Sequence, residues 1–134
     1  MTWAVVVAAT LTGVVTASLR YLALNGFSND HYLYLAGAQQ MLMGEWPTRD
    51  FVDPGMPLMY ALSAGSQLIL GQTLLAEATL VAVAYGFASA CVVIAAWRAS
   101  RSLVVACIAG LLCVAAFPRP YGYPKALLYA VGRC

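Results

Sequence analysis

Charged side chains are scarce in this sequence. Only 9% of its 134 residues are Asp, Glu, Lys or Arg, whereas soluble domains carry about 25%. The sequence has one histidine and no cluster of Lys and Arg, so no nucleic-acid partner is expected. Its four cysteines form no CxxC pair. We therefore expect them to be small buried apolar side chains, rather than metal ligands or disulfide partners.

Apolar residues are correspondingly abundant and make up 63% of the chain. A soluble fold of this length has too small an interior to hide that much apolar surface. The apolar runs at residues 3–22, 74–97 and 103–117 match, or nearly match, the about 30 Å of hydrocarbon in a bilayer. The first run lacks a preceding basic segment and is long for a cleaved signal peptide, so we expect a retained helix. The sequence thus predicts an all-α, polytopic membrane protein with about three transmembrane helices.

The polar chemistry is gathered in residues 29–57, which hold four of the five acidic residues and the histidine. Two short helices are predicted around this stretch. One covers about residues 30–43, begins among N-cap residue types and stops at Gly44; the other covers about residues 56–70 and stops at Gly71. Neither is long enough to cross a bilayer. We therefore expect two short juxtamembrane helices in the first loop.

One face of the first short helix carries Asp30, Tyr34, Gly37 and Met41, because these positions follow the i, i+4, i+7, i+11 spacing of a helix. The small Gly37 on the same face as a carboxylate is expected to leave space for a ligand. Helix capping is the plainer alternative for Asp30, since aspartate is a favoured N-cap residue. The two roles do not exclude each other.

Other polar residues allow more than one interpretation. Asp50 either pairs with its neighbour Arg49 or helps to bind an acceptor or a metal ion. Glu77, one turn inside the apolar run at 74–97, either reaches water or contacts the bundle near the site. His31 has no second histidine to support a metal site. No cofactor is predicted, and dependence on a divalent metal stays open.

From Asp30 onward the loop carries an ordered set of motifs. These are an acidic residue after the first span, a Y-x-x-x-A helix ending in Gly, a tryptophan, an Arg-Asp-Phe element, two prolines before Leu and a second helix ending in Gly. They stand at Asp30, Tyr34 with Ala38, Gly44, Trp46, Arg49-Asp50-Phe51, Pro54, Pro57-Leu58 and Gly71. This order resembles the first extracytoplasmic loop of the GT-C glycosyltransferases. The resemblance is strongest to bacterial relatives of the protein mannosyltransferases and of the aminoarabinose and galacturonic-acid transferases.

The resemblance implies transfer of a sugar from a polyprenyl-phosphate carrier to a lipid, glycan or protein acceptor. It places the reaction on the non-cytoplasmic face of a multi-pass protein, in the bacterial inner membrane. The first-loop carboxylate of the family, carried over onto Asp30, would be the general base that takes the acceptor's proton. Two departures are visible: Asn29-Asp30-His31 replaces a pair of adjacent acidic residues, and Gly55-Met56 replaces a lysine that binds the lipid phosphate in some members.

Without that lysine, phosphate binding falls to Arg49, Arg119 or Lys125, or to a part of the protein beyond this chain. Tyr34 and Asp50 complete the candidate substrate-binding residues. No metal-binding residue is predicted. Membrane lipids are expected as the surrounding partners of the apolar helices.

Residues 1–134 are expected to form a single membrane domain, the N-terminal fragment of a longer GT-C protein, because the family has many more spans. The fragment alone is then expected to be inactive. Two other functions stay open: a non-enzymatic membrane scaffold or assembly subunit, and a fragment of a transporter or flippase. The predicted spans carry no central charge, which disfavours a transporter. The distribution of Lys and Arg leaves the membrane orientation open.

Overall fold

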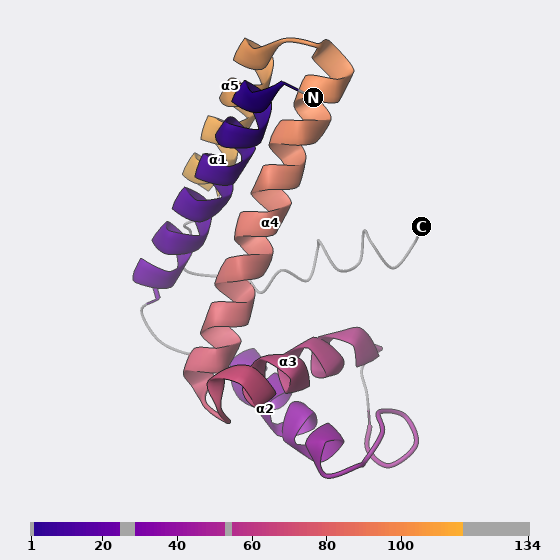
Figure 1. Ribbon diagram of the computed structural model, residues 1–134. Helices are drawn as coiled ribbons and strands as arrows, with labels where there is room; N and C mark the ends of the chain where they lie inside the picture. Colours follow the sequence, from indigo (N-terminus) through magenta and orange to yellow (C-terminus); the bar gives the residue numbers. More distant parts are fainter. Residues whose placement is uncertain (1, 25–28, 53–54, 117–134) are drawn as a thin grey trace. The chain divides into compact units, whose positions relative to one another are not determined.

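The computed structural model describes residues 2–24, 29–52 and 55–116, and within them the chain is mainly helical. No strand occurs among these residues; Pro47 and Phe51 form one isolated bridge. The helices are α1 (Trp3–Leu22), α2 (Asn29–Leu42), α3 (Pro57–Leu70), α4 (Leu74–Ser100) and α5 (Leu103–Ala116) (Figure 1). The predicted all-α class is confirmed, and each helix lies within a turn of its expected bounds.

Within the described residues, two helices, not three, are long and apolar enough to cross a membrane. They are α1, with 20 residues, and α4, with 27. The helix α5 is equally apolar in character, but its 14 residues extend only about 21 Å at 1.5 Å per residue. That length falls short of the about 30 Å of bilayer hydrocarbon. The expected third span at residues 103–117 is therefore corrected to a shorter apolar helix.

The chain divides into two units, each with its own packing. The first unit contains α1, α5 and the part of α4 from Val81, and the second contains α2, α3 and the first turns of α4 up to Leu80. Small residues allow close packing in the first unit. A Cβ atom built on Gly86 of α4 would lie 2.6 Å from the carbonyl oxygen of Gly13 on α1. The two backbones therefore approach each other directly, as is common between membrane helices.

The three cysteines among the described residues are not fully buried, contrary to the expectation. Cys91 and Cys107 are exposed and Cys113 is half-buried, and all three are free thiols. The interior of this small bundle is filled instead by other residues, such as the branched Val93 and the smaller Ala106, which are both fully buried. The thiols therefore lie on outward faces of α4 and α5.

In the second unit, α2 and α3 lie side by side as a helical hairpin (Figure 1). The helix α3 begins with Pro57 at its first position, where the missing N–H costs no intrahelical hydrogen bond. The chain leaves α2 at Gly44 and α3 at Gly71, both with positive φ, at 93° and 87°. Glycine has no Cβ to oppose this backbone conformation.

The interface between α2 and α3 is tight at Gly37. A Cβ atom built on Gly37 would lie 2.4 Å from Cε1 of Tyr60 on α3. Tyr60 is 1% exposed, and its ring also meets that of Tyr34, with 5.6 Å between the ring centroids. The space that we expected beside Gly37 is therefore filled by an aromatic side chain. The glycine serves helix packing and leaves no opening for a ligand.

Candidate functional site

Asp30 is the acidic residue in the first turn of α2, and it is half-buried. The unpaired N–H groups at a helix start, together with the helix dipole, favour a negative charge there. The neighbouring His31 is buried, with 7% exposure. Of the predicted site residues on α2, Asp30 is thus the one that reaches the surface.

Tyr34, predicted to bind substrate, lies inside the hairpin. It is 1% exposed, and its hydroxyl donates a hydrogen bond of 3.0 Å to the sulfur of Met56. Its ring packs against Tyr60. In this structure the Tyr34 side chain therefore contacts protein and contributes to the packing of α2 on α3.

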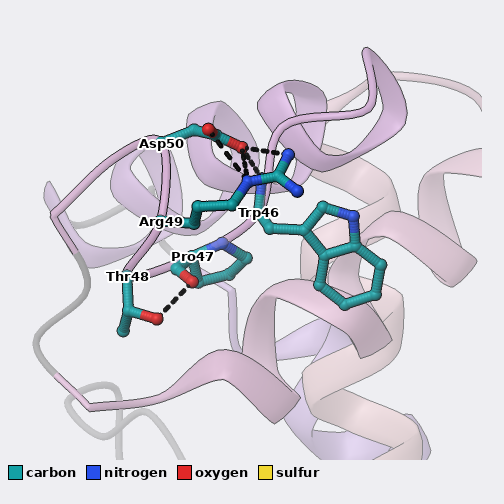
Figure 2. A network of polar contacts seen from close by, with 5 residues as sticks. All are labelled: Trp46, Pro47, Thr48, Arg49 and Asp50. Carbon is teal, nitrogen blue, oxygen red and sulfur yellow. Dashed lines mark hydrogen bonds and ion pairs between the residues drawn. The ribbon is translucent and has the colours of Figure 1, made fainter.

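Arg49 and Asp50 form an ion pair on the loop that follows α2 (Figure 2). The Nη2 and Nε atoms of Arg49 donate to Oδ2 of Asp50 over 2.6 and 2.9 Å. The backbone N–H of Trp46 donates to the same oxygen over 2.8 Å. The Arg49 hydrogen bonds and then the Trp46 N–H lower the pKa of the Asp50 carboxyl, while Asp50 raises the pKa of Arg49. The pairing interpretation of Asp50 is confirmed.

The loop that carries this pair is closed by its own backbone. The N–H of Thr48 donates to the carbonyl of Phe51 over 3.0 Å, and the N–H of Asp50 donates to the carbonyl of Trp46 over 2.9 Å. Thr48 has a positive φ of 69°, which non-glycine residues seldom adopt. The ring of Phe51 meets Tyr60 edge-on, with 5.6 Å between centroids. The loop is thereby attached to α3, and the ion pair has a fixed place on the surface.

The structure does not gather all the predicted site residues in one place. Asp30 lies at the start of α2, and the pair Arg49–Asp50 follows its end. The 14 residues of that helix separate the two ends by about 20 Å at 1.5 Å per residue. Arg119 and Lys125, the other candidate phosphate ligands, lie outside the described residues.

A buried polar cluster of Ser63, Gln67 and Glu77 was not predicted as such. Glu77, in the first turn of α4, is 0% exposed. The Ser63 hydroxyl donates to its Oε1, and the Nε2 of Gln67 donates to the same oxygen over 3.2 Å. Gln67 also donates to the backbone carbonyl of Leu35 on α2 over 3.3 Å. The cluster therefore joins α2, α3 and the start of α4, and of the two interpretations of Glu77 it favours the helix contact.

The sequence contains a spacing of polar residues that indicates this cluster. Ser63 and Gln67 stand four residues apart in a mainly apolar helix, so they share a face. A nearby carboxylate at the start of the next helix is a natural acceptor for them. The remaining oxygen of the Gln67 side chain, Oε1, is buried and has no hydrogen-bond partner within the described part of the chain.

Comparisons with protein-family models, with curated proteins and with solved structures found no match for this chain. In residues 2–24, 29–52 and 55–116, no group of three or more His, Cys, Asp or Glu is placed to hold a metal ion. Any functional assignment therefore rests on the motifs in the sequence and on the geometry of the residues above.

Proposed function

We propose that this chain belongs to a membrane glycosyltransferase of the GT-C type, which transfers a sugar from a polyprenyl-phosphate carrier. The observation that carries the proposal is the position of Asp30. It is a half-exposed carboxylate at the start of α2, in a folded helical unit that the chain inserts between α1 and α4, its two candidate membrane helices. The ordered motifs from Asp30 to Gly71 support the same assignment.

Asp30 is the general base in this proposal. The oxygen of an acceptor hydroxyl forms a bond to the anomeric carbon, and the bond from that carbon to the carrier phosphate breaks. The polyprenyl phosphate leaves with the bonding electrons, and the hydroxyl proton passes to the Asp30 carboxylate. The configuration at the carbon inverts without a covalent sugar–enzyme intermediate, so one carboxylate is sufficient. A positioned base contributes about 10²–10⁴ in rate.

The position of Arg49 limits its role among the candidate phosphate ligands. The leaving phosphate is bonded to the carbon under attack, so its ligand has to lie close to the base. Arg49 stands beyond the far end of α2 from Asp30 and is already paired with Asp50. We therefore assign the reacting phosphate to Arg119, to Lys125 or to a part of the protein beyond this chain. Arg49, whose side chain is 67% exposed, is left as a contact for more distant parts of the substrate.

The proposal places residues 23–72 on the non-cytoplasmic face of a bacterial inner membrane and the turn at 98–101 in the cytoplasm. The acceptor is a lipid, a glycan or a protein. The GT-C resemblance also implies further spans, so activity belongs to the complete gene product. A divalent metal is not required by the chemistry above, since a carboxylate and cationic side chains supply the proton acceptor and the phosphate ligands.

The test is purification of the complete gene product in lipid, followed by incubation with a panel of polyprenyl-phosphate sugars. The expected result is release of polyprenyl phosphate, together with transfer of the sugar to an acceptor in a membrane extract. Denatured protein is the control for spontaneous hydrolysis. A folded protein that turns over none of these donors would contradict the proposal and favour the scaffold function.

A further inference from the structure

The helix α3 buries Ser63 and Gln67 together with Met59 and Ala64, and its exposed positions are apolar. Its buried side chains include Tyr60, Ser63 and Gln67. All its exposed positions are apolar: Pro57 and Ala61 are small, and the others carry large side chains, namely Leu58 at 55%, Leu62 at 43%, Leu68 at 74%, Ile69 at 83% and Leu70 at 50%. A surface helix of a water-soluble protein has the opposite pattern, with its apolar stripe facing the core. Glutamine in particular is mostly exposed in such proteins.

The polar side chains of α3 also direct their hydrogen-bond donors inward. The hydroxyl of Ser63 donates to Glu77, and that of Ser66 donates to the carbonyl of Ala76 over 2.9 Å. The amide of Gln67 donates to Glu77 and to the carbonyl of Leu35. No residue of α3 is charged. A helix in contact with hydrocarbon has to satisfy its polar groups within the protein in this way, because lipid offers no hydrogen bonds.

We infer that the outer face of α3, formed by Leu58, Leu62, Leu68 and Ile69, lies against the acyl chains of the bilayer. The helix has 14 residues and a length of about 21 Å. It therefore enters one leaflet, or lies along it, without crossing the membrane. This inference rests on the proposed membrane placement of α1 and α4, and it adds α3 to the lipid-contacting surface.

The connection to α4 supports lipid as the occupant of this face. Leu70 ends α3, and the candidate membrane helix α4 begins at Leu74, so a linker of three residues ties α3 to a span. The exposed apolar positions also run along α3 from Leu58 to Leu70. A protein-binding patch ordinarily has a polar rim around an apolar centre. The continuous apolar face is instead the pattern of a helix surrounded by hydrocarbon.

The test uses spin labels on the complete gene product in phosphatidylcholine vesicles. Single cysteines replace Leu62 and Ile69 in a background in which every native cysteine is changed to alanine. Glu45→Cys, at an exposed loop position, is the aqueous control. Phe87→Cys, at a position 72% exposed in the middle of α4, is the membrane control. Relaxation of each label by oxygen, which concentrates in hydrocarbon, is compared with relaxation by a water-soluble nickel chelate.

Labels at positions 62 and 69 are expected to respond to oxygen several-fold more than to nickel, as the label at 87 does, and the label at 45 is expected to respond to nickel. If the label at 87 lies in lipid but the labels at 62 and 69 lie in water, the inference about α3 is overturned and the membrane placement of α4 stands. Labels at 62 and 69 that neither reagent reaches would also overturn it, because a protein surface would then cover α3. A label at 87 in water would remove the membrane placement, and the proposed function with it.

Discussion

The hydroxyl of Ser63 on α3 donates a hydrogen bond to the carboxylate of Glu77 in the first turn of α4, and both residues are fully buried. Gln67, one turn further along α3, adds a second donor to that carboxylate and reaches back to the carbonyl of Leu35 on α2. One carboxylate thus fixes α3, and through Gln67 it fixes α2, the helix that carries Asp30. Glu77 is accordingly a positioning residue for the candidate site.

Replacement of Glu77 by alanine is expected to lower the free energy of unfolding by about 2–4 kcal/mol. The change removes the acceptor that Ser63 and Gln67 share and leaves them the more distant carbonyls of Tyr34 and Leu35, at 3.4 and 3.3 Å. Each buried hydrogen bond lost in this way costs about 1–3 kcal/mol. Glu77→Gln retains one acceptor oxygen and should cost less. Helix content during titration with denaturing detergent measures the difference. The control is Glu45→Ala in an exposed loop; an equal loss in both variants would show that the buried cluster contributes nothing to stability.

Two glycines of the hairpin should respond in opposite directions to alanine. Gly37→Ala brings a methyl group into the buried ring of Tyr60, and such overpacking costs about 1–3 kcal/mol. Gly65 on α3 has no atom within 4 Å of a Cβ built on it, so Gly65→Ala should gain up to about 1 kcal/mol from helix propensity. Thermal unfolding followed by circular dichroism distinguishes them. Stabilisation by both substitutions would contradict the packing at Gly37.

The approximate bounds of the five helices were predictable because they depend on local features. Apolar runs, N-cap residue types and the helix stops at Gly44 and Gly71 can be recognised in the sequence itself. The ion pair of Arg49 and Asp50 was also accessible, since the two residues are neighbours. Features that depend on nearest neighbours and on periodicity were therefore open to prediction.

Contacts between helices were not predictable in the same way. The burial of Glu77 depends on Ser63 and Gln67, which lie 14 and 10 residues away. The glycine on the Asp30 face predicts open space from the sequence alone, but the ring of Tyr60, from the next helix, fills that space. The outward position of the cysteines likewise depends on how helices pack, because an apolar run gives no preferred face when almost every residue in it is apolar.

The pairing of Asp50 with Arg49 makes a prediction about pH. The pair lowers the folded-state pKa of Asp50 below the usual value of about 3.9. A lowered folded-state pKa means that the pair stabilises the loop fully above pH of about 4 and that this contribution is lost as the pH falls through the lower, folded-state value. Arg49→Ala should return the pKa of Asp50 toward its ordinary value.

Carbon-13 NMR of labelled aspartate carboxyl groups tests this. The sequence contains three aspartates, and Asp50→Asn identifies the resonance of Asp50. In the unaltered protein this carboxyl should titrate below its ordinary range, and Arg49→Ala should move the midpoint upward. An unchanged midpoint in Arg49→Ala would mean that the ion pair is not formed in solution.

Asp30→Asn in the complete gene product tests the assignment of the general base. Asparagine keeps the size of aspartate, and its side-chain oxygen still accepts hydrogen bonds from the N–H groups of the first turn of α2. The lost charge at the helix start costs at most about 1 kcal/mol of stability. The variant loses basicity, so turnover should fall by about 10²–10⁴. The affinity for the polyprenyl-phosphate donor should change little, because the base contacts the acceptor.

The matched control is Glu45→Gln, which neutralises an exposed carboxylate after the other end of α2 and should leave turnover unchanged. Measuring donor affinity together with turnover distinguishes loss of the base from displacement of α2. Glu77→Ala, which loosens α2, should alter both quantities. Asp30→Asn should alter turnover alone. Unaltered turnover in Asp30→Asn would reduce Asp30 to a residue that stabilises a helix start. The base would then have to be Asp50 or a carboxylate beyond Cys134.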